Sequence, residues 1–557
     1  MKRLLSPTAA ATRPLALCAA AALAVTVLVG CSSSANQTAA TGGATLTIQG
    51  DSGSPTLVEN FNPFQGAELH GTYLIYEPLE IPSPIDGRYS EFLATGHKFT
   101  DPTTLVYTIR QGVKWSDGKD FTAADVVYTF NLLKQYPALD TKGIWQQVSA
   151  VSGTGNDVTV TFKSANVPFA STVAQTPIVP QHVWSSISDP AKDTNVSPVG
   201  TGPYTLDKFA PTQYSLKKNP TYWQADKVVP SKVVFPAQAS NQSTNQLDVT
   251  SGKFDWSYNF LPNVKQTYVD RDPAHNAYWF PPGGTIGLFL NLTKAPYDNA
   301  DFRKGLSLAL SRTTIATKAV NGYLDQASQS GLILPNLTKW LDPSLPNQGL
   351  VNQDSAGAQA AFARAGYSMN GGKLVGANGK QVSMSIVMPG NFSDWVAAAK
   401  EVVNQFGGIG INVSLDLPQY AQYSQSIQAG TFDAAMGGYG GSGDPYTDFN
   451  NALNSGFATA VNTPTANNFQ RFKDAAVDQA LAALAAATDA TTQQQATYKL
   501  EQVMFNATPI ILLYYGGSWG LFSTKNFTGW PSATNPYTLP TNYNNSLLTV
   551  LTHLTKA

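Results

Sequence analysis

The sequence predicts an α/β protein with mixed sheets that is divided into more than one lobe. Residues 382–436 alternate between short apolar runs and helical apolar stripes, an order typical of parallel strands joined by right-handed crossovers. Residues 105–131 predict a strand, a turn and a helix in direct succession. The chain has 557 residues, more than one hydrophobic core normally serves. We therefore expect two or three lobes.

The stretch 105–131, LVYTIRQGVKWSDGKDFTAADVVYTFN, contains the clearest local signals. It begins with strand-forming residues, and residues 113–115 are expected to continue the strand. Residues 116–118 form a turn, since glycine tolerates the backbone angles that turns need. Thr122 stands three residues before Asp125, which predicts a capping box at the start of an apolar helical stripe.

The remaining elements follow from the same two apolar periodicities. Strands are expected at 45–49, 158–162, 288–292, 382–388, 411–417, 431–436 and 510–515. Helices are expected at 299–321, 395–406, 420–428, 469–487 and 491–505. Asp86-Gly87 predicts a hairpin turn. The strand and helix order between 382 and 436 predicts a largely parallel sheet there.

Residues 1–30 predict a signal peptide. A basic start precedes the apolar run 15–29, which is too short to span a bilayer comfortably. Leu-Val-Gly-Cys at 28–31 resembles a lipobox, so we expect cleavage before Cys31 and acylation of its thiol. An ordinary secretory signal with a chance cysteine is the alternative. Residues 31–43 are small and polar, as in a flexible tether, and several acyl chains would hold the protein on a membrane.

Charge and cysteine content exclude some classes of protein. The chain has 35 basic and 36 acidic residues, and cleavage before Cys31 would remove three of the basic ones. A weakly acidic chain without basic clusters argues against nucleic-acid binding. Cys18 would leave with the signal peptide and Cys31 would be acylated, so no disulfide is expected. An exported chain of this length has a core large enough to fold without one.

The stretch 105–131 closely resembles a motif of the family 5 extracellular solute-binding proteins, lipoproteins that feed ABC importers. Further resemblances to this family lie at 76–79 (YEPL), 199–204 (VGTGPY), 217–223 (KKNPTYW) and 288–322. Neither a Lys-Ser or Lys-Thr pair nor a helix start follows the glycines at 200 and 202. These two glycines predict a tight crossover of the chain rather than a phosphate-binding loop.

The resemblance implies a periplasmic-binding-protein-like type II fold (cluster C). Its expected parts are a discontinuous lobe I (44–65, 195–285 and 511–557), an inserted lobe II (66–194) and an α/β lobe III (286–510). Ligand would lie between lobes I and III and be enclosed by closure about the connecting strands. The resemblance also implies a monomer on the outer face of the cell membrane that delivers a solute to an ABC permease, with no cofactor and no catalysis.

The segment 430–449, GTFDAAMGGYGGSGDPYTDF, is the expected ligand-binding stretch. Five glycines between Met436 and Asp444 weaken any strand, and close approach of the backbone to a ligand is one reason for them. A flexible surface loop is the alternative. The candidate residues are Gly437, Gly438, Tyr439, Gly440, Gly441, Ser442 and Asp444.

The class of ligand stays open between a short peptide and a neutral oligosaccharide. In peptide binders of this family an aspartate in this segment pairs with the α-amino group of the peptide. Its place falls on Gly441 or Ser442, which leaves Asp444 as the replacement carboxylate. Family members that bind oligosaccharides stack sugars on aromatic rings, and here Trp256, Trp279 and Tyr420 are the candidates.

A secreted hydrolase is the alternative from another class. Residues 516–520, GGSWG, match the G-x-S-x-G string, but no acidic residue follows Ser518 and the only later histidine is His553. The five histidines are scattered without metal-ligand spacing, so no metal site is expected. A glycosidase carboxylate pair has no fixed spacing, and the sequence leaves it open.

Overall fold

The computed structural model describes residues 43–50, 56–238 and 241–557. The predicted signal peptide, Cys31 and all but the last residue of the tether lie outside the described residues. None of the helices in the described part of the chain has the length and apolarity needed to cross a bilayer. Helices and mixed sheets occur together, which confirms the α/β fold class.

Two sheets join segments that are far apart in the sequence. One has the strand order β1-β10-β9-β8 and the other β11-β20-β12. Their strands are β1 (Thr45–Thr47), β8 (Tyr204–Ala210), β9 (Gln213–Lys218), β10 (Lys232–Pro236), β11 (Trp256–Tyr258), β12 (Asn276–Trp279) and β20 (Gly520–Ser523). The same segments hold α5 (Gln242–Thr250), α6 (Val264–Thr267), α15 (Asn544–Leu551) and the ladder of β21 (Phe527–Thr528) with β22 (Thr555–Lys556). These pairings support the proposed composition of lobe I.

The segment proposed as lobe II contains an antiparallel sheet of order β4-β5-β7-β6. Its elements are β4 (Ala94–Asp101), β5 (Thr104–Ile109), β6 (Val148–Thr154), β7 (Asp157–Phe162), α1 (Ala123–Gln135), α2 (Ile144–Gln147), α3 (Ala170–Ala174) and α4 (Gln181–Trp184). The capping box is confirmed, because the Thr122 backbone N–H donates to the Asp125 carboxylate at 2.9 Å. Residues 113–115 do not continue β5. The turn folds the chain back, and Lys114 forms an isolated bridge with Asp120 instead.

A short hairpin in the same segment is important for the site. Strands β2 (Glu80–Pro82) and β3 (Tyr89–Glu91) pair antiparallel, with Pro82 opposite Tyr89. The turn predicted at Asp86-Gly87 is present, and Gly87 has a φ of 72°. We call residues Ser83–Arg88 the hairpin tip.

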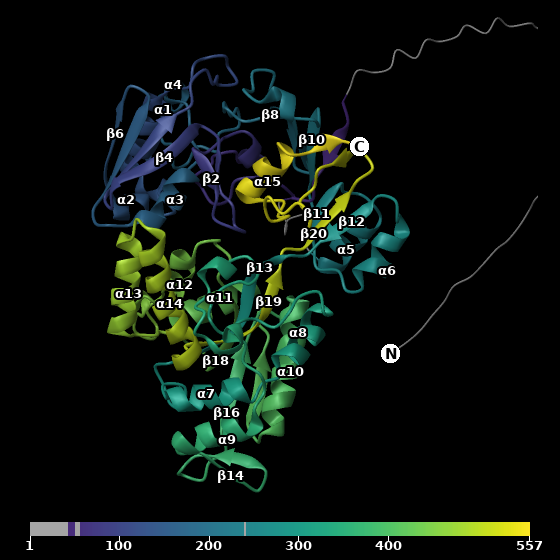
Figure 1. Ribbon diagram of the computed structural model, residues 1–557. Coiled ribbons are helices and arrows are strands. Elements are labelled where there is room, and N and C mark those ends of the chain that lie inside the picture. Colours follow the sequence, from purple (N-terminus) through teal and green to yellow (C-terminus); the bar gives the residue numbers. More distant parts are fainter. Residues whose placement is uncertain (1–42, 51–55, 239–240) are drawn as a thin grey trace, which may run out of the picture. The chain divides into compact units, whose positions relative to one another are not determined.

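The largest sheet has the order β17-β16-β18-β13-β19. Its strands are β13 (Pro282–Leu290), β16 (Ser383–Val387), β17 (Asn412–Asp416), β18 (Ala434–Tyr439) and β19 (Ile510–Gly517). Strand β16 pairs parallel with β17 and β18, whereas β13 pairs antiparallel with β18 and β19. The three strands of segment 382–436 run parallel, as predicted. The complete sheet is mixed, because β13 runs against its two neighbours β18 and β19. Strands β13 and β19 come from outside the segment 382–436 (Figure 1).

The boundaries proposed for lobe III fall within β13 and at the start of β19. These two neighbouring strands thus connect the large sheet with the segments assigned to lobe I. We keep the three-lobe division as a proposal. Lobes I and II share one apolar cluster, which includes Leu46, Tyr107 and Trp256, while a second cluster is built around the large sheet.

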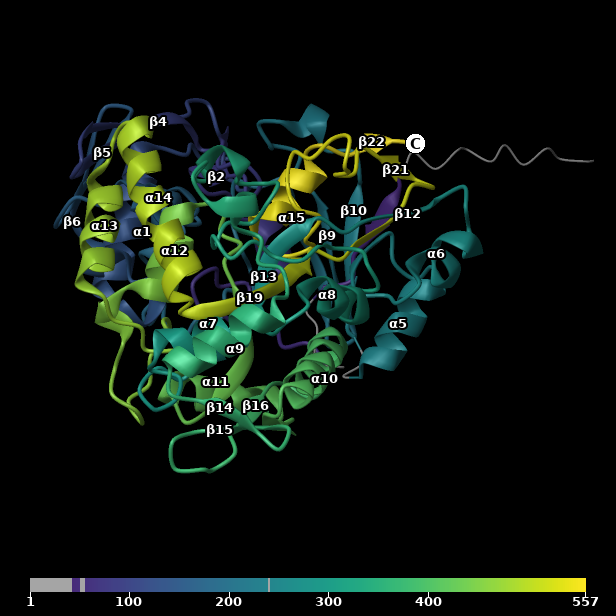
Figure 2. The ribbon, with the colours of Figure 1, turned by 60° about the horizontal axis from the view of Figure 1, so that its bottom comes forward.

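Eight helices of the described chain surround the large sheet. They are α7 (Ala300–Leu308), α8 (Arg312–Val320), α9 (Ser355–Arg364), α10 (Ser393–Gly408), α11 (Tyr420–Ala429), α12 (Pro445–Leu453), α13 (Ala475–Ala486) and α14 (Ala490–Ala507), with the hairpin β14 (Ser368–Asn370) and β15 (Lys373–Val375). Of these helices, α9 and α12 were not predicted. Helices α13 and α14 pack against each other (Figure 2). The helix predicted at 299–321 is two helices. Ser311 occupies the N-cap position of the second one, and its hydroxyl lies 2.8 Å from that of Thr314.

Three of the family-like motifs meet at one buried carboxylate. Glu77 is fully buried and accepts hydrogen bonds from Tyr222 Oη at 2.9 Å and from Trp223 Nε1 at 3.1 and 3.2 Å. Beside it, Gly200 packs so tightly that a Cβ atom would lie 1.9 Å from Ile75 O. The glycines at 200 and 202 therefore form the tight crossover that the sequence predicted.

Candidate functional site

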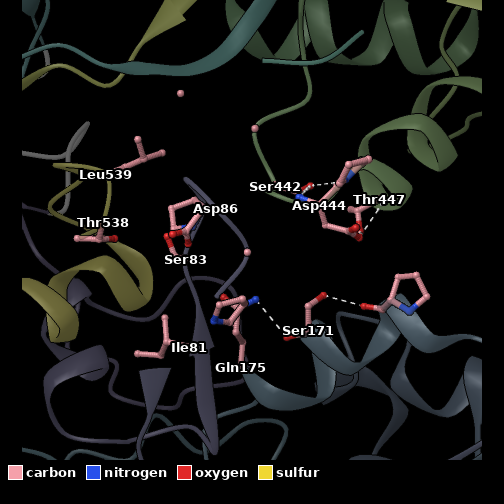
Figure 3. Close-up of a pocket in the computed structure, with 18 of the residues that line it drawn as sticks. Ile81, Ser83, Asp86, Ser171, Gln175, Ser442, Asp444, Thr447, Thr538 and Leu539 are labelled. Atoms are coloured by element: carbon pink, nitrogen blue, oxygen red, sulfur yellow. Dashed lines mark hydrogen bonds between the residues drawn. The ribbon is translucent and has the colours of Figure 1, made fainter. Parts of the chain in front are cut away.

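The main cavity of the described chain has a volume of about 780 Å³. Its walls come from the hairpin tip, from α3 and the 3₁₀ turn Val167–Phe169 before it, from the ends of β13 and β19, from the segment 441–447 and from the segment 538–546. Figure 3 shows Ser442, Asp444 and Thr447 on one side, Thr538 and Leu539 on the other, and hairpin residues between them. All three proposed lobes thus contribute to one cavity.

The glycine-rich segment reaches the cavity only with its C-terminal part. Gly441, Ser442 and Asp444 line the cavity, whereas the four predicted residues before them do not. The earlier four are Gly437, Gly438 and Tyr439 in β18 and Gly440 directly after it. We call residues Gly440–Asp444 the glycine loop.

The glycines allow the chain to approach itself closely. A Cβ atom on Gly441 would lie 2.3 Å from Gly283 O, and one on Gly443 would lie 2.7 Å from Pro84 Cα. Both residues also have positive φ, 103° and 78°. The expectation that these glycines are needed for close approach to a ligand is therefore incomplete, because their own neighbours in the fold already require them.

Asp444 lines the cavity and also caps a helix. Its carboxylate accepts hydrogen bonds from the backbone N–H groups of Tyr446 (3.2 Å) and Thr447 (3.1 Å) and from Thr447 Oγ1 (2.7 Å) at the start of α12. Burial raises the pKa of this carboxyl above its ordinary value, and the three hydrogen bonds lower it in part. Asp444 is thus an engaged carboxylate with a structural role.

A second carboxylate under the glycine loop was missed from the sequence. Asp448 is buried and accepts hydrogen bonds from Gly441 N at 3.1 Å and Ser442 N at 3.2 Å. Burial raises the pKa of Asp448 to about 6, against the hydrogen bonds from Ser442 and Gly441, which lower it. Asp448 holds the shape of the glycine loop. Its position one turn after the cap Asp444 was the available signal.

The aromatic residues proposed for stacking do not line the cavity. Trp256 is fully buried, contacts Trp530 at a ring distance of 5.6 Å, and donates from Nε1 to Pro540 O at 3.2 Å. Trp279 lies in β12 and packs against the apolar cluster shared by lobes I and II. Tyr420 is exposed at the start of α11. None of the three therefore lies at this cavity: the two tryptophans are used in packing, and Tyr420 lies elsewhere on the surface.

Other aromatic residues line the cavity instead. Tyr258 and Tyr543 line the cavity with ring centroids 5.4 Å apart, and Tyr258 Oη donates to Gly517 O at 3.2 Å. Trp340 and Tyr446 contribute two further rings. Much of the remaining lining is uncharged and polar, from Ser83, Ser171, Gln175, Ser442, Thr447, Gln493, Thr538, Thr541 and Asn545.

Four ionisable side chains of the described chain line the cavity, and each already has a partner. Asp86 Oδ2 lies 2.5 Å from Arg88 Nε, and His97 Nδ1 lies 2.5 Å from the Glu80 carboxylate. Lys339 Nζ donates to a backbone oxygen at 2.9 Å, and Asp444 caps α12. Lys339 and Asp444 thus have hydrogen-bond partners without an opposite charge, and most of the other polar groups of the cavity are hydroxyls and amides.

Ser518 lines the cavity without the geometry of a nucleophile elbow. It is 2% exposed, follows the end of β19 and precedes strand β20, where the elbow would need a helix. Its backbone N–H donates to Pro281 O at 2.8 Å. Within the described ranges, no group of three or more metal-ligating side chains is placed to hold a metal ion.

Comparison with known proteins gives a consistent result. The family described as "Bacterial extracellular solute-binding proteins, family 5 Middle" matches residues 88–460. The periplasmic oligopeptide-binding protein OppA of Salmonella typhimurium is 24% identical over 477 residues, covering 79% of this chain and 81% of the relative.

Two solved structures are similar to this chain over most of its length. A periplasmic oligopeptide-binding protein of an oligopeptide ABC transporter from Thermotoga maritima superposes with a TM-score of 0.84 at 25% identity, covering 92% of this chain and 99% of that chain. A second structure of the Thermotoga protein, with mannohexaose bound, gives a TM-score of 0.77 at the same identity and coverage.

Proposed function

The chain belongs to the bacterial extracellular solute-binding proteins of family 5, and from this premise we propose that it is the lipid-anchored receptor of an ABC importer. The protein captures a solute outside the cytoplasm and delivers it to the permease. The observation that carries the proposal is the cavity of about 780 Å³, to which all three proposed lobes contribute. A cavity of this kind encloses a small ligand when lobes close about connecting strands, here β13 and β19.

The proposed role is binding without chemistry. OppA of Salmonella and the Thermotoga protein are both named for binding. We therefore place Ser518 in the cavity wall and assign it no catalytic step.

Membrane attachment through Cys31 gives a direct test of the lipid anchor. Cys31→Ala is expected to move the protein from the membrane fraction to the soluble exported fraction, because the acyl chains supply the membrane affinity. Fractionation after a high-salt wash, followed by immunoblotting, measures this. Cys18→Ala is the matched control, since that cysteine would leave with the signal peptide. A Cys31→Ala protein that still sediments with membranes would contradict the anchor.

A short peptide is the first candidate ligand. OppA of Salmonella and the Thermotoga protein are both named as oligopeptide-binding. Backbone groups at a cavity wall can bond a peptide main chain. A peptide ammonium enclosed in the cavity also needs a carboxylate, and Asp444 is the lining carboxylate of the glycine loop.

A neutral oligosaccharide is the second candidate, and two observations favour it. The Thermotoga protein has been solved with mannohexaose bound. In this chain the lining is rich in hydroxyls, amides and rings, and its ionisable side chains are engaged within the protein. Hydroxyl groups of a sugar pair well with such donors and acceptors, and its apolar faces pack on rings.

Asp444→Asn separates the two ligand classes. Asparagine also caps helices well, so α12 should be kept. Loss of the carboxylate is expected to weaken peptide binding by about 2–5 kcal/mol, because the ammonium is left unpaired. Sugar binding is expected to change much less, since the amide oxygen still accepts hydrogen bonds.

Thermal-shift titration with oligopeptides and with oligosaccharides measures these differences. Ligand at about 100 times its Kd stabilises the protein by about 2.7 kcal/mol, which is easily detected. Asp354→Asn is the control, because Asp354 caps α9 through its side chain and does not line the cavity. A tight peptide complex that tolerates Asp444→Asn would contradict the assigned role of this carboxylate.

A further inference from the structure

The hairpin tip reaches the opposite wall of the cavity. Its backbone is held by bonds within the turn, from Ser83 N to Arg88 O at 2.7 Å and from Gly87 N to Ser83 O at 2.9 Å. The side chain of Asp86 pairs with Arg88 at 2.5 Å. The tip is therefore a small, internally bonded turn.

Two residues distant in the sequence meet the tip. Lys339 lies in the 3₁₀ turn Thr338–Trp340, and its Nζ donates to Asp86 O at 2.9 Å. Gly443 of the glycine loop faces Pro84, where a Cβ atom would lie only 2.7 Å from Pro84 Cα. Both contacts join the proposed lobe II to the proposed lobe III.

The contact brings the two walls together. Main chain meets main chain at Pro84 and Gly443, where a methyl group on Gly443 would not fit. A Cβ atom on Gly87 would lie in ordinary van der Waals contact with Gly443 O, at 3.6 Å. All three residues also line the cavity, so the contact is part of its wall.

We propose that the hairpin tip, by its contact with Gly443 and Lys339, is a stop that sets the longest ligand the cavity accepts. The inference rests on the proposed function, and it applies to a peptide and to an oligosaccharide alike. A linear ligand lying along the glycine loop can extend only as far as the tip. A further unit would have to separate Pro84 from Gly443 and break the bond from Lys339 to the tip.

A simple closing contact would behave differently. If the tip only held the lobes together, its removal would weaken ligands of every length by the same factor. A stop affects only ligands that are too long, so dependence on ligand length distinguishes the two roles.

The experiment compares three variants with the wild-type protein lacking its signal peptide. In the first, residues 83–88 are replaced by Asn-Gly, which joins Pro82 to Tyr89 by a two-residue turn and keeps the β2–β3 pairing. The second is Lys339→Ala. The third, Lys380→Ala, is the control, because it removes the same charge at an exposed position that does not line the cavity. Thermal melts without ligand verify that each variant folds.

Isothermal titration calorimetry measures the affinity for two series of ligands, alanine peptides and mannooligosaccharides, each from dimer to octamer. The wild-type protein and Lys380→Ala are expected to lose affinity sharply beyond one length. In the Asn-Gly variant, the affinity for the next longer ligands relative to that for short ligands should rise at least about tenfold over the wild type, and Lys339→Ala should shift the limit in the same direction by less.

Equal weakening at all lengths, or an unchanged limit in the Asn-Gly variant, would overturn the stop. Wild-type binding that does not depend on length would also overturn it. If no peptide and no oligosaccharide of either series binds the wild type, the ligand classes of the proposed function are wrong, and the proposed length limit is contradicted as well.

Discussion

Gly200→Ala is expected to lower the free energy of unfolding by about 4 kcal/mol or more, which is a large part of the stability of an ordinary protein. A Cβ atom at this position would lie 1.9 Å from Ile75 O and 2.6 Å from Ile75 C. Both atoms belong to the main chain, so no side-chain rotation relieves the clash. The same crossover is bonded from Ser116 N to Gly200 O at 2.9 Å, and a displaced chain would break that bond as well.

Denaturant unfolding followed by circular dichroism measures this effect. Gly407→Ala is the matched control, because Gly407 is exposed in α10 and its added Cβ would meet no atom within 4 Å. Alanine favours the helix there, so the control should be unchanged or more stable by about 0.5–1 kcal/mol. A Gly200→Ala protein that unfolds at the wild-type denaturant concentration would show that the crossover is not tight.

Local patterns predicted the elements of the α/β segment correctly. The alternating elements between 382 and 436 appear as β16, α10, β17, α11 and β18, since apolar periodicity reports which side of an element is buried. The capping box at Thr122 and Asp125 was likewise a short-range signal. The parallel pairing of β16, β17 and β18 was predicted as well. The antiparallel strand β13 and the edge strand β19 were not assigned to this sheet, because they join it from distant parts of the chain.

The site was predicted only in part, and the errors have physical causes. A run of glycines shows that something approaches the backbone, but not whether it is a ligand or, as at Gly441, another strand of the same protein. A tryptophan contributes similar apolar area in a core and in a binding site, so Trp256 was placed wrongly. The roles of the hairpin tip and of Asp448 in the site were missed because they depend on tertiary contacts.

Stability should depend on pH through Glu77. Burial raises the pKa of this carboxyl to about 7, although bonds from Tyr222, Thr201 and Trp223 and the charge of Arg110 lower it in part. The folded protein therefore holds the proton more tightly than the unfolded chain, in which the pKa is near 4.5. Stability from this group is present at low pH and is lost as pH rises from about 4.5 to about 7, by about 3 kcal/mol.

Glu77→Gln should remove this loss, because glutamine is neutral at every pH and still accepts hydrogen bonds from Tyr222 and Trp223. The variant is expected to match the wild type near pH 4.5 and to be more stable by about 3 kcal/mol near pH 8. Chemical denaturation at a series of pH values measures both. The comparison is made between variants, because Asp394 and Asp448, whose pKa values burial raises to about 6, titrate in the same window.

Two further variants sharpen this test. Asp226→Asn, the same acid-to-amide change at an exposed site close to Tyr222, should leave the pH profile unchanged. Glu77→Ala should be less stable than the wild type by about 2–5 kcal/mol near pH 4.5, since the Tyr222 hydroxyl and the Trp223 N–H would lose their buried acceptor. This difference should shrink by about 3 kcal/mol by pH 8, because alanine does not titrate. If Glu77→Gln follows the wild-type profile in parallel from pH 4.5 to pH 8, Glu77 does not titrate in this range and its burial costs less than the structure indicates.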